Sequence, residues 1–223
     1  GNMLTVEFTG AVTQNEVAYA ILGDIRLKCE VIRVRGNRAD LQAFESTNDI
    51  KVGDQVEFDD ELLSVELGPG LLTQVFDGLQ NPLPDLAERS GFFLQRGVYL
   101  NALDRQKTWE FTPAVKAGDT VRAGDKIGSV PEGMFEHYIM VPFGWPGEWK
   151  IVSIAPQGDY NIVTPIAKAE NSKGEQRDIT MMQRWPVKVA ISCYKEKLLA
   201  NQPMITQTRS IDTFFPVATG GTF

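Results

Sequence analysis

The sequence predicts a mainly β protein, with a small β-barrel at its N-terminal end and a compact β-sandwich further along the chain. Three observations support this fold class. Short runs of alternating apolar and polar residues fill the first sixty positions, with turn residues between them. A Gly-Asp turn later recurs six residues apart, at Gly118-Asp119 and Gly124-Asp125. The stretch between these regions is punctuated by Pro and Gly and has little strand character.

The barrel prediction depends on a series of short strands. These are expected over residues 4–8, 18–22, 27–34, 39–44 and 55–58. The turns between them include Gly23-Asp24, Gly36-Asn37 and Gly53-Asp54, and Gly, Asn and Asp are residues that tight turns favour. Such closely spaced strands are typical of a small barrel, because closure removes exposed strand edges.

The middle stretch begins at Gly68-Pro69-Gly70, where Pro between two glycines interrupts the strand pattern. Residues 74–83 are predicted to form a turn or a short helix that ends at Asn81-Pro82, and residues 85–89 one further helical turn.

The strand pattern returns at Trp109. Gly118-Asp119 and Gly124-Asp125 indicate tight turns, because Gly adopts positive φ and the Asp side chain bonds nearby backbone. Residues 162–168 and 178–182 are predicted to form a hairpin, whose polar residues 168–177 are expected to face outward.

The last part of the chain is predicted to be a strand at residues 185–189, followed by extended chain. Ser210 or Asp212 is expected to cap a helix over residues 211–215, which Pro216 stops.

The composition argues against several classes of protein. The formal net charge is −7 and the Lys and Arg residues are scattered, which disfavours a nucleic-acid-binding surface. No apolar run reaches the length of a membrane span, of about 18 residues or more. The start at Gly1-Asn2-Met3 lacks the pattern of a secretory signal. Cys29 and Cys193 are too few for a disulfide framework, so we expect a reducing cytoplasm and two buried, small apolar side chains.

No pattern in the sequence predicts a catalytic, cofactor-binding or metal-binding residue. His137 is the only histidine, so neither a zinc site nor a Ser/His/Asp triad is arguable, and a structural or surface role is expected. Asp59-Asp60-Glu61 is expected to be a solvated surface. The aromatic residues in 143–149 are expected in turn and core positions, with ligand binding as the alternative. The phosphate-binding pattern Gly-x-x-x-x-Gly-Lys-Ser/Thr does not occur.

Three stretches of the chain carry a family resemblance. They are Ser64-Val65-Glu66-Leu67-Gly68-Pro69-Gly70 with Phe76-Asp77-Gly78-Leu79-Gln80-Asn81-Pro82-Leu83, then Met182-Gln183-Arg184-Trp185-Pro186-Val187, and finally Ile211-Asp212-Thr213-Phe214-Phe215-Pro216 with Gly220-Gly221-Thr222. Together they resemble the catalytic A subunit of V-type and archaeal-type rotary ATPases. Ala102-Leu103-Asp104-Arg105 and Val141-Pro142 fit the same pattern, so the resemblance covers nearly the whole chain in order.

The resemblance implies a domain organisation. Residues 3–67 are expected to form the barrel of the hexamer crown, and residues 111–183 an inserted bulge domain. Residues 68–110 and 184–223 are expected to be the leading segments of an incomplete α/β nucleotide-binding domain.

The resemblance also implies a function and its partners. The parent protein is expected to couple ATP hydrolysis or synthesis to proton or sodium transport, with Mg-ATP as its cofactor. The phosphate loop is expected just after Phe223, so this chain is expected to be an inactive N-terminal fragment with no ATP site. Its expected partners are the B subunits and the central and peripheral stalks, on the cytoplasmic face of a membrane that it does not enter.

Two alternatives remain open at this point. The Gly-Asp repeat also resembles the turns of biotinyl- and lipoyl-type carrier domains, which present a modified lysine at an exposed hairpin tip. Asp125-Lys126-Ile127-Gly128 matches that pattern poorly, because Lys126 lies within the second repeat. The third interpretation is a purely structural β-domain without a ligand.

Overall fold

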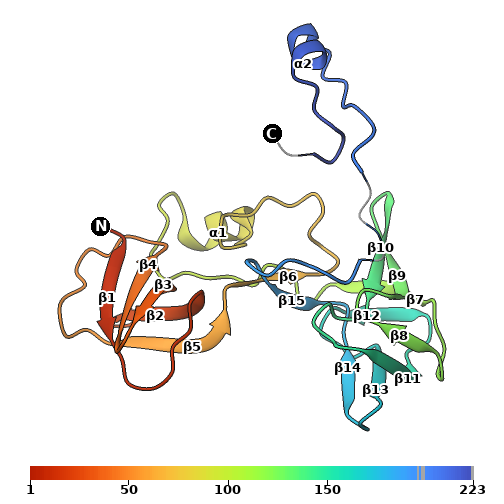
Figure 1. The fold of residues 1–223 in the computed structure, drawn as a ribbon, viewed down its shortest axis with the longest axis horizontal. Helices are drawn as coiled ribbons and strands as arrows, with labels where there is room; N and C mark the ends of the chain where they lie inside the picture. The colour runs from red at the N-terminus through yellow and green to blue at the C-terminus, as the bar shows by residue number, and fades with distance from the viewer. Residues whose placement is uncertain (195, 197–198, 222–223) are drawn as a thin grey trace. The chain divides into compact units, whose positions relative to one another are not determined.

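The computed structural model describes residues 1–194, 196 and 199–221, and it contains two compact units, Gly1–Ile191 and Ser192–Phe223 (Figure 1). The first unit is mainly β, as predicted. Its elements, in chain order, are β1 (Met3–Glu7), β2 (Glu16–Leu22), β3 (Ile25–Arg35), β4 (Arg38–Ala43), β5 (Val56–Leu62), β6 (Ser64–Leu67), α1 (Leu83–Ser90), β7 (Thr108–Pro113), β8 (Thr120–Arg122), β9 (Lys126–Glu132), β10 (Phe135–Met140), β11 (Glu148–Ile154), β12 (Gly158–Asn161), β13 (Ala167–Asn171), β14 (Gln176–Ile179) and β15 (Gln183–Pro186).

The N-terminal barrel is a curled five-stranded antiparallel sheet in the order β1-β4-β3-β2-β5. Its core consists of Ala18, Ala20, Leu27, Cys29, Val31, Ala39, Leu41 and Ala43. Side chains of both edge strands pack on this same core, among them Val6 of β1 and Val56 of β5. The rings of Phe8 and Phe58 meet edge-on with centroids 5.9 Å apart. The two edges therefore meet through side chains.

Strands β2, β3 and β5 of the barrel are longer than the alternation of residues predicted, whereas β1 and β4 have the predicted lengths. Strand β5 continues to Leu62 and includes the acidic run Asp59-Asp60-Glu61. Its carboxylates are tolerated in a strand because β5 is an edge of the sheet, where side chains reach water. The buried carboxylate of Glu16 accepts a bond from the Asp60 amide at 3.1 Å, which helps to hold the irregular pairing of β2 with β5.

The second domain is a sandwich of two four-stranded sheets, β10-β9-β7-β12 and β14-β13-β11-β8. Its core contains Leu103, Trp109, Phe111, Val121, Ile127, Val130, Ile139, Val141, Trp149, Ile151, Ile162, Ile166, Ala167, Ala169, Ile179 and Met181. The core begins before residue 111, since Leu103 and Trp109 belong to it. The domain limits inferred from the resemblance remain a proposal.

The repeated Gly-Asp turns have the same geometry in both copies. The Asp119 carboxylate accepts the Lys116 amide at 2.9 Å, and the Asp125 carboxylate accepts the Arg122 amide at 2.8 Å. The amide of Gly118 donates to the Ile151 carbonyl, and that of Gly124 to the Val141 carbonyl. Both glycines have positive φ, as the sequence predicted. The repeat therefore supplies two equivalent corners of the sandwich.

The predicted hairpin is confirmed, with its strands displaced from the predicted ranges. It is formed by β13 and β14. Residues 172–177 of the predicted outward-facing stretch are exposed, whereas residues 168, 170 and 171 are partly buried and Ala169 is fully buried. The Asn171 side chain sets the turn by accepting the amides of Lys173 at 2.9 Å and Glu175 at 3.0 Å. This local bonding by Asn171 makes the turn tight, so the two strands extend closer to the tip than the apolar pattern suggested.

The second unit contains helix α2 (Arg209–Phe214). The capping prediction is wrong, because the helix begins after Thr208 without a side-chain capping bond. The Asp212 carboxylate instead accepts the amides of Thr206 at 3.0 Å and Gln207 at 3.1 Å, which lie before the helix. The phosphate loop is predicted to follow Phe223. Thr222 and Phe223 lie outside the described residues.

Candidate functional site: the anchored segment between barrel and sandwich

The candidate site is the segment 68–107, which links the barrel to the sandwich and has only one helix, α1. It begins where β6 leaves the barrel. Strand β6 pairs antiparallel with β15, which returns from the sandwich, so that Leu67 lies opposite Gln183 and Ser64 opposite Pro186 (Figure 1). The entry and the exit of the sandwich are therefore neighbouring strands.

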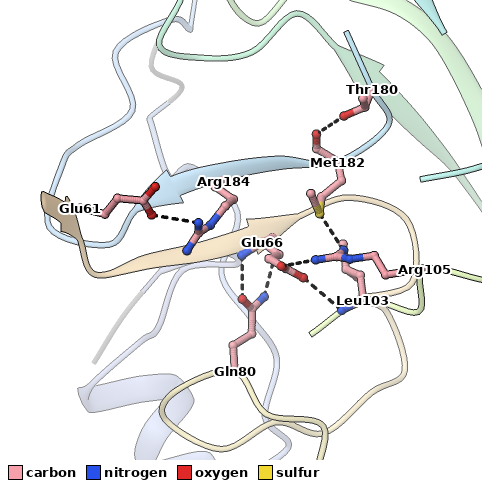
Figure 2. Close-up of polar contacts among 8 residues, drawn as sticks. All are labelled: Glu61, Glu66, Gln80, Leu103, Arg105, Thr180, Met182 and Arg184. Carbon is pink, nitrogen blue, oxygen red and sulfur yellow. Dashed lines mark hydrogen bonds and ion pairs between the residues drawn. The ribbon is translucent and has the colours of Figure 1, made fainter. Parts of the chain in front are cut away.

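Glu66 of β6 connects three parts of this segment, as Figure 2 shows. Its carboxylate pairs with the Arg105 guanidinium and accepts the Leu103 amide at 3.3 Å. Its backbone exchanges two hydrogen bonds with the Gln80 side chain, at 2.7 and 2.8 Å. Arg105 also contacts the Met182 sulfur at 2.8 Å. Because the Glu66 side chain is only 16% exposed, this pair is screened less than a surface salt bridge.

A second carboxylate holds the same segment from the barrel side. Glu45 accepts the Gly97 amide at 2.9 Å and the Tyr99 hydroxyl at 3.1 Å. The Tyr99 oxygen in turn accepts the Lys28 amide of β3 at 2.7 Å. Burial raises the pKa of Tyr99, and the Glu45 carboxylate adds to this against the opposing effect of the Lys28 amide. The phenol therefore stays protonated and keeps both bonds.

The interior of the segment is tied together by Asp77 and Asn81. Asp77 accepts the backbone amide of Asn81 at 2.7 Å and its side-chain amide at 2.8 Å. The Asn81 side-chain oxygen then accepts the Leu100 amide at 2.8 Å. Asn81 is only 3% exposed, so these bonds satisfy a polar side chain that would otherwise be costly to bury. The residues before and after α1 are thus joined.

Two ion pairs fix the returning chain to the barrel. Arg184 lies 2.9 Å from the Glu61 carboxylate in an exposed pair (Figure 2). Lys188 lies 2.6 Å from the Glu30 carboxylate, whose side chain is 7% exposed, although this contact lacks the angles of a hydrogen bond. Lys188 also donates to the Asn15 side chain at 3.1 Å. Removing Lys188 is expected to lower the free energy of unfolding more than removing Arg184, because it would leave the nearly buried Glu30 carboxylate without its cation.

The residues that were considered from the sequence as candidates for a site contact other residues of the sandwich or lie in a core. His137 contacts Glu132, with 2.7 Å between Nδ1 and a carboxylate oxygen. The rings of Trp145 and Trp149 lie 4.3 Å apart, and Trp149 is buried in the sandwich, as expected for core aromatics. Cys29 is buried as predicted, whereas Cys193 is only partly buried.

Neither a metal centre nor a membrane helix is found in the described part of the chain. Within residues 1–194, 196 and 199–221, no three His, Cys, Asp or Glu side chains gather in a group suited to a metal ion. The same residues form no helix that is long and apolar enough to cross a membrane.

The anchoring carboxylates were missed by sequence reasoning. Glu45, Glu66 and Glu132 are isolated acidic residues that bond amides distant in sequence. In the sequence, only the residues whose amides these carboxylates bind give a hint of the contact. Two of them are Gly70 and Gly97, and both have positive φ. The arrangement binds backbone amides and fixes loops.

Comparison with known proteins assigns the two domains. The ATP synthase alpha/beta family β-barrel domain matches residues 1–59, and the ATP synthase alpha/beta subunit barrel-sandwich domain matches residues 100–188. V-type ATP synthase alpha chains match along all 223 residues, with 56% identity for that of Treponema denticola. The chain corresponds to the N-terminal region of V-type ATP synthase alpha chains. The relatives from Borreliella afzelii and Borreliella burgdorferi are also 56% identical over the whole chain.

The chain spans well under half of the relatives that it matches. It covers 38% of the Treponema denticola alpha chain and 39% of each Borreliella alpha chain. Within this N-terminal region, the anchored segment occupies most of the interval between the two matched domains.

Proposed function

We propose that this chain is the N-terminal part of the catalytic A subunit of a V/A-type rotary ATPase. The observation that carries the proposal is the 56% identity with V-type ATP synthase alpha chains over all 223 residues. The whole subunit would use Mg-ATP and couple ATP hydrolysis or synthesis to proton or sodium transport across a membrane. It would lie on the cytoplasmic face of that membrane as part of the ATPase head.

This region would supply assembly surfaces and hold no part of the ATP site. The barrel would join the hexamer crown with B subunits, and the sandwich would contact stalk subunits. Two exposed features support this role: the polar residues 172–178 of the β13–β14 hairpin, and the apolar side chains of Phe92 and Phe93, which are 95% and 79% exposed. Exposed apolar groups of this size are typical of interaction surfaces.

Nucleotide binding tests the proposed division of labour. Mg-ATP is titrated by calorimetry into this chain and into a longer version that includes the phosphate loop expected after Phe223. We expect no heat of binding from this chain and saturable binding by the longer one. Binding by this chain alone, or Mg-dependent ATP turnover above the level of a mock purification, would refute the assignment of the ATP site to another region.

Hydrogen exchange tests the proposed partner surface. The amides of residues 172–178 are expected to exchange faster in the isolated chain than the buried amide of Ile151 in β11, because this hairpin lies at an exposed edge of its sheet. They are expected to become protected in the assembled head if this hairpin contacts a stalk. Protection in the isolated chain, or none in the assembly, would contradict the stator-contact role.

The carrier-domain alternative has a specific test at Lys126. This residue lies at the start of β9, where its ammonium group bonds Glu136 at 2.9 Å and lies 3.8 Å from the centre of the Tyr138 ring. These contacts disfavour a swinging lysine. An intact mass equal to that of the unmodified sequence is expected, and a lysine-linked cofactor would restore the carrier interpretation.

A further inference from the structure

The loop of residues 68–72 is docked on the sandwich, although it follows directly from the barrel-side strand β6. Leu71 packs against the sandwich core. Gly68 passes close to the backbone at Met181, a residue of the sandwich core. A Cβ added to Gly68 would lie 2.9 Å from the Met181 carbonyl oxygen. Gly70 has a φ of +108°, a conformation that side chains rarely adopt. The loop is therefore held in one particular shape against the sandwich.

Glu132 supplies the polar part of this docking. It is the last residue of β9, and it is only 7% exposed. One carboxylate oxygen accepts the amides of Gly70 at 2.7 Å and Leu72 at 3.2 Å. The other oxygen lies 2.7 Å from Nδ1 of His137 on the neighbouring strand β10. Both oxygens of this largely buried carboxylate thus have partners.

Two amides that converge on one oxygen form a small anion-binding cradle in the backbone. Here the anion is a side chain of another domain. Without it, both amides would lose a charged acceptor at a partly buried position, which is unfavourable. The shape of the loop therefore depends on Glu132 as well as on the loop's own residues.

We propose that Glu132 is a latch by which the inserted sandwich sets the conformation of residues 68–72, and that His137 is the positioning residue that orients its carboxylate. The first amide that Glu132 holds, that of Gly70, lies three residues beyond the end of β6 and four beyond Glu66, so the latch fixes the chain just after the junction. A displacement of the β9–β10 hairpin is transmitted to this loop through the carboxylate. The role belongs to the fold itself and does not depend on the proposed ATPase function.

Amide hydrogen exchange measured by NMR on the full chain tests the latch. In Glu132→Ala, the amides of Gly70 and Leu72 are expected to exchange about tenfold faster or more, because a bond to a charged acceptor is lost. Glu132→Gln keeps an acceptor oxygen without the charge, so an increase of about threefold is expected. The buried amide of Ile151 in β11, which bonds the Asp119 carbonyl, is expected to stay unchanged.

Three matched variants separate positioning from folding. Glu136→Gln lies on the same hairpin but pairs with Lys126, so protection of the loop amides is expected to stay at the wild-type level. His137→Ala is expected to accelerate exchange at Gly70 and Leu72, and His137→Asn to restore protection, because an Asn side-chain nitrogen can occupy the place of Nδ1. Unchanged exchange at both amides in Glu132→Ala overturns the proposal, as does acceleration of Ile151 by the same factor.

Discussion

Gly128 is the position at which the structure makes the sharpest prediction about stability. It lies in β9, opposite Pro113 of β7, with the fully buried Phe111 beside it. A Cβ added here would overlap Cε2 of Phe111, and it would lie 2.5 Å from Cζ of that ring and 2.7 Å from the Thr112 carbonyl oxygen. Neither the buried ring nor the paired backbone yields easily. We therefore expect Gly128→Ala to lower the free energy of unfolding by about 3 kcal/mol, the upper end for overpacking.

The natural assay is tryptophan fluorescence during chemical denaturation. The four tryptophans of the chain lie between residues 109 and 185, so their signal reports the sandwich and the β6–β15 pairing, and the barrel does not contribute. This separation matters because a protein with several domains need not unfold in one step. Gly78→Ala is the matched control, because an added Cβ there meets nothing within 4 Å.

A second substitution tests the cause of the effect. Phe111→Leu alone is expected to cost about 1 kcal/mol, since a buried ring is replaced by a smaller side chain. Combined with Gly128→Ala, it is expected to recover about 1 kcal/mol of the loss, because the overlapping ring is gone. The reasoning is refuted if Gly128→Ala is as mild as Gly78→Ala, or if the two effects simply add.

Three other predictions test separate contacts. Gly97→Ala is expected to lower the melting temperature in calorimetry, because Gly97 has a φ of +74° and its Cβ would lie 2.7 Å from a barrel side chain; an unchanged midpoint contradicts this. Arg105→Met is expected to cost about 1–2 kcal/mol, and much less in a Glu66→Gln background, and a double-mutant cycle without coupling would refute the pair. Hydrogen bonds from Thr206 lower the pKa of Asp212 below its usual 3.8. The stabilisation that ionised Asp212 gives to the second unit is therefore fully present above pH 3.8, and it is lost as the pH falls through the lowered pKa of Asp212. The NMR chemical shift of the Thr206 amide, measured against pH, reports the protonation of Asp212. A titration midpoint above pH 3.8 would contradict the expectation.

The local structure of the two domains was predictable because it depends on short-range patterns. The Gly118-Asp119 and Gly124-Asp125 turns are dictated by residues that bond their own neighbours, so the sequence indicates them directly. Strand ends were predicted less well. In β5, the position at the sheet edge permits the acidic run that the alternation of residues appeared to exclude.

The anchored segment could not be predicted in the same way. Glu66 and Arg105 are far apart in sequence, and nothing near either residue indicates its partner. The same holds for Glu132, whose role depends on a loop that precedes it by sixty residues. The resemblance found the family and the order of the domains, but only the folded chain shows which carboxylate meets which amide.

The pairing of β6 with β15 has a consequence for the order in which the protein folds. Leu67 and Gln183 become partners only if the ends of the whole intervening stretch are brought together, and closing an open chain of about a hundred residues costs about 4 kcal/mol in entropy. The pairing of two four-residue strands is too weak to offset this entropy, so it forms only after its two ends have been brought close together. The sandwich delivers both ends to one place once it has formed. We therefore expect this two-stranded pairing to be a late step, so that its appearance during refolding would mark the completion of the inserted domain.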